Sequence, residues 1–173
     1  HRDLHLSLRR QRQMCIRDSI GIAGTDIIRS GLNSVKMMHD HLSETAGESY
    51  DQNTVARRYA ELGVRLEALE MLESRALTAA EGSGESMILP LPLKLLGTDL
   101  QQDLADLSID ILGDSSLPRV GYGFGEGESG NEPNIRARGP EAMRSMLSGR
   151  ASTIYGGTSE VQRGIMSKFV LGL

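Results

Sequence analysis

The sequence predicts an all-α fold, an antiparallel up-and-down helical bundle, on the basis of three observations. Apolar residues recur at helical spacing in several long segments, the composition favours helices, and no segment reads as a strand. Hydrophobic residues make up 39% of the 173-residue chain, whereas aromatic residues, which are typical of strands, make up only 3%. A chain of this length can bury a core as a single domain.

The clearest predicted helix spans residues 54–81. Its apolar residues are spaced by three or four positions over about six turns, which places them on one face of the helix. The residues of this stripe are Val55, Tyr59, Leu62, Leu66, Leu69, Leu72 and Ala76.

Four further helices are predicted around it. One covers residues 20–42, and another runs from the prolines at positions 90 and 92 to about Leu112. A short helix is expected at 140–147, because proline is favoured in a first turn, and a final helix at 159–170. Residues 43–53 hold turn formers and are predicted to be a loop. The helix that ends near Leu112 is expected to face the core with Leu96, Leu100, Leu104, Leu107 and Ile111.

Residues 1–19 are set apart from a predicted helical domain at 20–173. They carry five arginines and two aspartates, and they contain Cys15, the only cysteine of the chain. Their sequence resembles the translation of sequencing-adapter read-through. We therefore expect a non-native or disordered tail here; the alternative is a basic arm for an acidic partner. Within the domain, residues 114–139 lack periodicity and are predicted to form a long loop.

Composition argues against several classes of function. A net charge of −4 argues against nucleic acid as a partner, and no apolar run approaches the roughly 20 residues that span a membrane. A single cysteine fits a reducing compartment, so we expect a cytoplasmic, bacterial protein. His39 and His41 lie two positions apart and would point to different faces of a helix, so we expect no metal site.

The strongest functional signal is the segment IYGGTSEVQR at residues 154–163. Gly156 and Gly157 carry no side chains and would allow a ligand to approach the backbone closely. Ser159 and Gln162 have the spacing of a capping box, and free amides at a helix start bind anionic or electron-rich groups. The alternative is an ordinary capped helix after a Gly-Gly turn.

This segment resembles the signature I-Y-[E/G]-G-T-S-x-[I/V]-Q-R of the acyl-CoA dehydrogenase family, and looser similarity covers roughly residues 20–173. The resemblance implies the helical C-terminal domain of a flavoenzyme that oxidises an acyl-CoA thioester to the 2,3-enoyl-CoA. In that reaction a carboxylate removes the α proton and FAD accepts the β hydride. The resemblance also implies a homo- or heterotetramer and an electron-transfer flavoprotein as the electron acceptor.

The same resemblance assigns expected roles within the segment. Thr158, Ser159 and Glu160 are expected to contact FAD. Tyr155, Gly156 and Gly157 are expected to line the acyl thioester site.

The chain departs from the family pattern at the catalytic base. In much of the family a glutamate directly follows the tyrosine of the signature, but Gly156 stands there and cannot act as a base. Some relatives place the glutamate at the end of an earlier helix, where this chain has S-E-T-A-G. Glu44 is therefore the candidate base. Its alternative role is that of a solvated acid at a helix end, and Glu48 and Asp51 are nearby competitors.

A second departure concerns the motif Q-x-x-G-G, which meets FAD across the dimer interface in the family. Here the sequence is D-I-L-G-D: Asp110 replaces the glutamine, Gly113 keeps the first glycine, and Asp114 replaces the second. A carboxylate near the FAD phosphates would repel them. Together with Gly156, this departure supports an alternative hypothesis, a noncatalytic subunit that serves assembly and shares the FAD of a partner.

We predict that the 173-residue chain by itself is inactive. The resemblance implies that other domains of the family supply much of the flavin and substrate pocket. Absorbance spectra of the purified chain, together with an assay for enoyl-CoA, test this prediction. Stoichiometric flavin with enoyl-CoA formation would contradict it.

Overall fold

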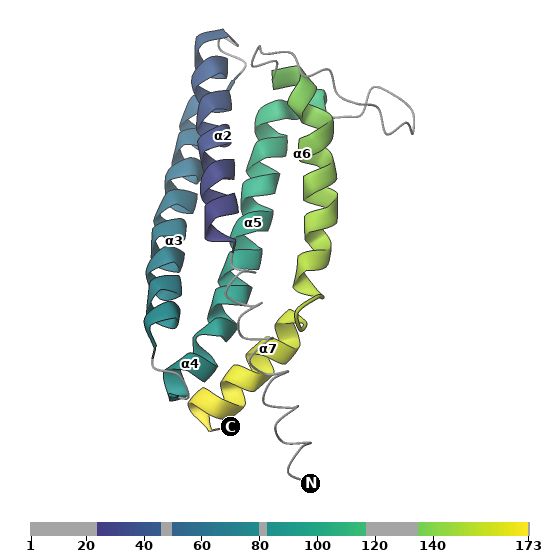
Figure 1. The fold of residues 1–173 in the computed structure, drawn as a ribbon. Coiled ribbons are helices and arrows are strands. Elements are labelled where there is room, and N and C mark those ends of the chain that lie inside the picture. The colour runs from purple at the N-terminus through teal and green to yellow at the C-terminus, as the bar shows by residue number, and fades with distance from the viewer. Residues whose placement is uncertain (1–23, 46–49, 80–82, 117–134, 173) are drawn as a thin grey trace. The chain divides into compact units, whose positions relative to one another are not determined.

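The computed structural model describes residues 24–45, 50–79, 83–116 and 135–172. All regular secondary structure in these ranges is helical, which confirms the predicted all-α fold (Figure 1). The predicted tail at 1–19, Glu48 and most of the predicted loop at 114–139 lie outside the described residues.

Three long helices and three shorter ones form the described part of the chain. Short 3-10 or π-helical turns follow α5, α6 and α7: η2 (Gly113–Ser116), η3 (Arg150–Thr153) and η4 (Ser167–Leu171). The α-helices are α2 (Thr25–Thr45), α3 (Gln52–Thr78), α4 (Gly84–Ile88), α5 (Pro90–Leu112), α6 (Ile135–Gly149) and α7 (Ser159–Met166).

The chain divides into two compact units, and α2, α3 and α5 each contribute residues to both. Unit 1 comprises His1–Ile27, Arg65–Leu100 and Ser152–Leu173, so that its described part contains α4, α7 and η4. Unit 2 comprises Ile28–Val64 and Gln101–Ala151, and its described part contains η2 and α6.

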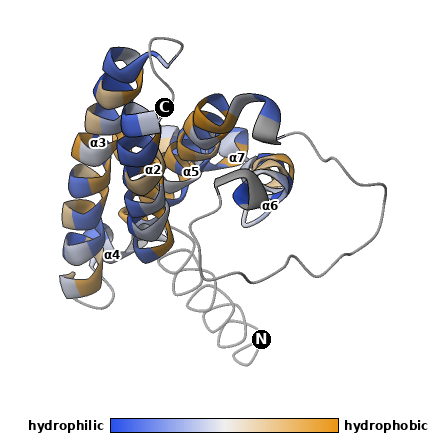
Figure 2. Ribbon diagram, turned by 90° about the horizontal axis from the view of Figure 1, so that it is seen from above, coloured by the Kyte–Doolittle hydropathy of each residue, from blue (hydrophilic) through white to orange (hydrophobic). Residues whose placement is uncertain are grey.

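The predicted stripe of α3 is confirmed by burial. Five of its seven residues are buried and the other two are half-buried. Figure 2 shows hydrophobic and hydrophilic residues sharing each long helix, as expected for amphipathic helices. The buried stripe residues are Val55 and Leu62 in unit 2, and Leu66, Leu69 and Ala76 in unit 1.

Several helix boundaries differ from the prediction; α3, for example, spans Gln52–Thr78 and not 54–81. α4 was not expected; its first turn is capped by Ser83, whose side chain accepts a hydrogen bond from the Ser86 amide at 3.2 Å. α6 begins at Ile135, so Pro140 lies inside the helix and not in its first turn. A proline inside a helix removes one backbone hydrogen bond, and the prediction gave this cost too much weight. α2 extends to Thr45, three residues beyond its predicted end.

Two helical glycines of unit 2 meet different surroundings. A Cβ at Gly31 of α2 would lie 2.7 Å from the Leu104 Cδ2 atom, whereas a Cβ at Gly63 of α3 would lie 3.9 Å from the Leu32 Cδ2 atom. The first distance is a clash with a buried side chain and the second is ordinary van der Waals contact. Gly31 therefore permits close approach to Leu104.

We predict that Gly63→Ala and Gly31→Ala have different effects on stability. Gly63→Ala should raise the free energy of unfolding by about 0.5–1 kcal/mol, because alanine favours helix and fits there. Gly31→Ala should not raise the free energy of unfolding, since displacing the packed Leu104 side chain costs about 1–3 kcal/mol and offsets the gain in helix propensity. Urea denaturation of the two variants measures the difference. Equal stabilisation by both would contradict the packing described here.

Candidate functional site

The Gly156–Gly157 turn joins η3 to α7 in unit 1. Both glycines have positive φ angles, 70° and 95° respectively, in a region that residues with a Cβ rarely adopt. A Cβ at Gly157 would also lie 2.7 Å from the Gln162 Nε2 atom. The backbone conformation therefore favours glycine at both positions, and at Gly157 the Gln162 side chain would also have to move to admit a Cβ.

Two buried side chains hold the carbonyl groups of this turn. The Gln162 Nε2 atom donates a hydrogen bond to the Gly156 carbonyl oxygen at 2.9 Å. The Lys94 Nζ atom, from α5, donates to the Gly157 carbonyl oxygen, also at 2.9 Å. Lys94 is 0% exposed and Gln162 is 7% exposed. Sequence reasoning missed Lys94, because it lies among leucines and far from the motif.

The start of α7 differs from the predicted capping box. The N-cap is Thr158, whose side-chain oxygen accepts a hydrogen bond from the Val161 amide at 3.3 Å, and Ser159 is the first helical residue. Gln162 turns back to Gly156 and does not complete a box. The prediction of Ser159 as the cap was therefore wrong by one residue, because either side chain can cap and the extended backbone of Thr158 decides between them.

Glu160 is held at the same helix start. Hydrogen bonds from its own backbone amide and from the Thr158 hydroxyl lower the pKa of its carboxyl, and the charges of Arg163 and Lys94 act in the same direction. Glu160 is therefore ionised at neutral pH, and it favourably meets the positive end of the α7 dipole. Since Val161 and Glu160 already donate their amides within the protein, this helix start suits a hydroxyl donor better than a phosphate.

Lys94 is affected by opposing influences. Burial lowers the pKa of its ammonium group, while the carboxylates of Asp99 and Glu160 act to raise it. Loss of water is the larger effect because the side chain is fully covered.

The expected substrate residues are accessible. Tyr155 is 56% exposed, and Gly156 and Gly157 are also exposed. The turn thus presents backbone and one aromatic side chain to solvent, while its carbonyl groups are held from the inner side.

The candidate bases belong to unit 2. Glu44 is the next-to-last residue of α2 and is exposed. Asp51 accepts a hydrogen bond from the Thr54 amide at 3.1 Å, and hydrogen bonds from Thr54 lower the pKa of its carboxyl. Asp51 therefore acts as a cap of α3, which distinguishes it from Glu44.

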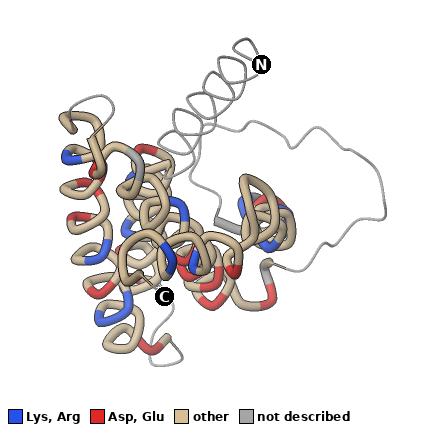
Figure 3. The backbone as a smooth tube through the Cα atoms, turned by 90° about the horizontal axis from the view of Figure 1, so that it is seen from below, with Lys and Arg blue, Asp and Glu red and all other residues tan. Residues whose placement is uncertain are grey.

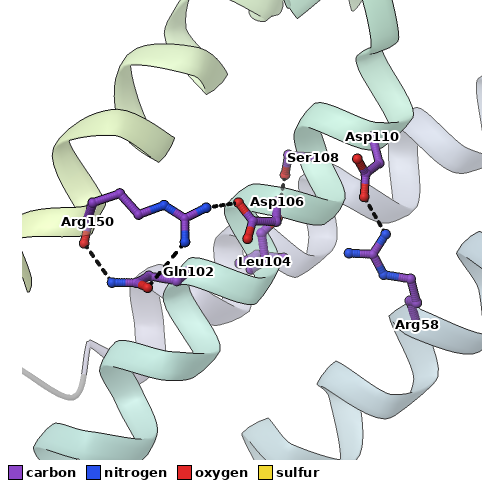
Figure 4. A network of polar contacts seen from close by, with 8 residues as sticks. Arg58, Gln102, Leu104, Asp106, Ser108, Asp110 and Arg150 are labelled. Atoms are coloured by element: carbon purple, nitrogen blue, oxygen red, sulfur yellow. Dashed lines mark hydrogen bonds and ion pairs between the residues drawn. The ribbon is translucent and has the colours of Figure 1, made fainter. Parts of the chain in front are cut away.

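Asp110 has an ion-pair partner that the sequence did not reveal. Its carboxylate pairs with the guanidinium group of Arg58, which lies on α3 (Figure 4). This pairing offsets the negative charge of the Asp110 carboxylate. Gly113, at the end of α5, has a positive φ of 50°, as is common for a glycine that ends a helix.

A second network in unit 2 joins α5 to the end of α6. Arg150 pairs with Asp106 and also contacts Gln102, while the Gln102 Nε2 atom donates to the Gly149 carbonyl oxygen at 3.2 Å (Figure 4). Figure 3 shows acidic and basic residues mixed along the described helices. Within the described ranges, no helix has both the length and the apolar character needed to cross a membrane.

We predict that Thr158→Val lowers the free energy of unfolding by about 1 kcal/mol, because the cap of α7 is lost. It should also raise the pKa of Glu160 toward its ordinary value, because one hydrogen bond to the carboxylate disappears. Urea denaturation measures the first effect, and a carbon-13 NMR titration of the carboxyl group measures the second.

Because the pKa of Glu160 is lowered in the folded protein, the free energy of unfolding should decrease at low pH. The contribution of Glu160 to stability is present above the pKa of the unfolded chain and is lost as the pH falls through the folded-state value. Ser159→Ala serves as the control and should leave the pKa of Glu160 unchanged. A Ser159→Ala variant that shifts this pKa more than Thr158→Val would contradict the assignment of the cap.

Comparison with known families covers almost the whole chain. The family model described as Acyl-CoA dehydrogenase, C-terminal domain, matches residues 17–171. The match begins near the end of the segment that was expected to be a foreign tail. No match is found among curated proteins. The chain belongs to the acyl-CoA dehydrogenase family, whose C-terminal helical domain it contains.

Proposed function

We propose that this domain is part of a flavin-dependent dehydrogenase that oxidises an acyl-CoA thioester to the 2,3-enoyl-CoA. Family membership supports a function of the acyl-CoA dehydrogenase type. The observation that carries the finer proposal is the Gly156–Gly157 turn, whose backbone is exposed on one side and hydrogen-bonded on the other. A fixed, bare backbone is a suitable surface against which to orient a flat thioester group.

The proposed thioester site consists of Tyr155, Gly156 and Gly157. The absence of Cβ atoms at the two glycines lets a substrate approach the peptide groups within hydrogen-bonding distance. A hydrogen bond to the thioester carbonyl would stabilise the negative charge that develops there when the α proton leaves. The exposed ring of Tyr155 offers apolar area for the acyl chain.

In unit 1 the proposed cofactor residues are Thr158, Ser159 and Glu160. In unit 2 they are Asp110 and Gly113, whose motif the resemblance places against FAD across the dimer interface. The ionised carboxylate of Glu160 fits the hydroxyl groups of a nucleotide sugar, which can donate to it. Arg58 compensates the charge of Asp110, so this carboxylate does not exclude a flavin nucleotide. Bound FAD would supply the hydride acceptor for the β carbon.

Glu44 is the proposed base for the α proton. Gly156 offers no side chain for that step, and Asp51 is engaged at the start of α3. An exposed carboxylate at the end of a helix is accessible to a substrate when the full enzyme is assembled. We further propose a cytoplasmic bacterial enzyme of lipid or steroid degradation, a homo- or heterotetramer that passes electrons to an electron-transfer flavoprotein.

A noncatalytic subunit remains the second candidate function. Two features of the sequence favour it: Gly156 offers no carboxylate, and Asp110 stands where the resemblance implies a glutamine. In that case the bundle would serve assembly and hold the FAD of a partner subunit.

We predict that Glu44→Gln in the full-length protein slows enoyl-CoA formation by about 100-fold or more, because positioned bases contribute about 10²–10⁴-fold. The amide keeps the size of the side chain but cannot accept the proton. Steady-state assays with an acyl-CoA and an artificial electron acceptor measure the rate, and flavin absorbance verifies that the cofactor is retained.

The control variant is Glu67→Gln, which changes another exposed glutamate of a long helix. It should leave turnover unchanged. Unchanged turnover in Glu44→Gln would remove Glu44 as the base. If the unmodified protein turns over only when mixed with a partner subunit, the second candidate function would replace the first.

A further inference from the structure

We propose that Lys94 is a positioning residue: with Gln162, it fixes the direction of the backbone N–H groups of Gly157 and Thr158 in the turn that lines the thioester site. The identity of that site rests on the proposed function. The positioning itself rests on the contacts of unit 1.

The first argument is the burial of the lysine. Lysine is almost never fully buried unless it is paired, because loss of water from an ammonium group is costly. Lys94 is 0% exposed, and its neighbours Leu93 and Leu95 in α5 are also buried. The hydrogen bond that it makes is to the carbonyl oxygen of Gly157, 63 residues later in the chain. The carboxylates of Asp99 and Glu160 help to stabilise the charge, while the directional contact of the ammonium group is the one with the turn.

The second argument is the geometry of the peptide groups. The described residues contain no cis peptide bond, so each carbonyl points opposite to the N–H of the next residue in the same plane. Holding the Gly156 carbonyl fixes the Gly157 N–H, and holding the Gly157 carbonyl fixes the Thr158 N–H. Both N–H groups consequently point away from Lys94 and Gln162, the side chains that hold the carbonyls.

The third argument is the conformational freedom of two adjacent glycines. Without side chains they would sample many backbone conformations, and a site built on them would lose its orientation. The Gln162 Oε1 atom is buried without a hydrogen-bond partner among the described residues, while its Nε2 atom is bonded to Gly156. A buried acceptor without a partner is unfavourable. The hydrogen bond from Nε2 to the turn is the interaction that compensates for it and holds the side chain in this position.

The test compares Lys94→Met with Lys168→Met in the full-length protein. Both variants remove one positive charge of unit 1, but Lys94 is buried and bonded to the turn, whereas Lys168 is an exposed residue of η4. In Lys94→Met, hydrogen exchange of the amides at residues 154–162 should accelerate about tenfold or more, and kcat should fall about 10- to 100-fold with KM little changed. Lys168→Met should alter neither quantity.

Gln162→Met provides a second variant that releases the Gly156 carbonyl without removing a charge. It should accelerate exchange in the same peptide and lower kcat, which keeps the test decisive if Lys94→Met does not fold. Unchanged exchange in folded variants would overturn the proposal, and so would faster exchange with unchanged kcat. If the unmodified protein has no dehydrogenase activity, the proposed function fails, while unchanged exchange alone would refute the positioning.

Discussion

A buried ammonium group must have a partner, and in unit 1 the Lys94 ammonium donates a hydrogen bond to the carbonyl of Gly157 and is attracted by the carboxylates of Asp99 and Glu160. The Lys94–Gly157 hydrogen bond connects α5 to the turn before α7. Because the turn consists of two glycines at positive φ, its own sequence provides little rigidity, and the rigidity comes from Lys94 and Gln162. The start of α7, with its Thr158 cap and the ionised Glu160, follows directly from the position of this turn.

Unit 2 uses charges in a different way. The pairs Arg58–Asp110 and Arg150–Asp106 are only partly covered, so each contributes little stability, about 0–1 kcal/mol. Buried apolar residues along α2, α3 and α5 supply the larger share of stability. The polar pairs instead favour particular neighbours: Arg58 of α3 is paired with Asp110 of α5, and Arg150 with Asp106 of α5.

Local patterns in the sequence predicted the helices well because the apolar residues of a helix's buried face recur every three or four positions. The stripe of α3 is the best example, since its members from Val55 to Ala76 are buried or half-buried. The same reasoning failed for Leu96, which was expected in the core and is 48% exposed, while Lys94 is buried in the same helix. The hydrogen-bond partner of this lysine lies 63 positions away in the sequence, which periodicity does not reveal.

In the candidate site, too, the local features could be predicted from the sequence, whereas the contacts between distant residues could not. The glycine pair and the helix start were recognisable from the segment at 154–163, because turn and cap preferences act over a few residues. The choice of Thr158 over Ser159 as the cap depends on backbone angles set by the held turn. The partners of Gly157 and Asp110 come from other helices, 63 and 52 positions away, so only the fold could identify them.

The central claim is that a buried ammonium group holds the backbone of the Gly156–Gly157 turn. The most direct measurement is an NMR scalar coupling across the hydrogen bond between the Lys94 Nζ atom and the Gly157 carbonyl carbon in isotopically labelled protein. The structure predicts a measurable coupling and a slowly exchanging Lys94 ammonium signal. An Nζ signal that exchanges as fast as those of exposed lysines, with no coupling to Gly157, would contradict the claim.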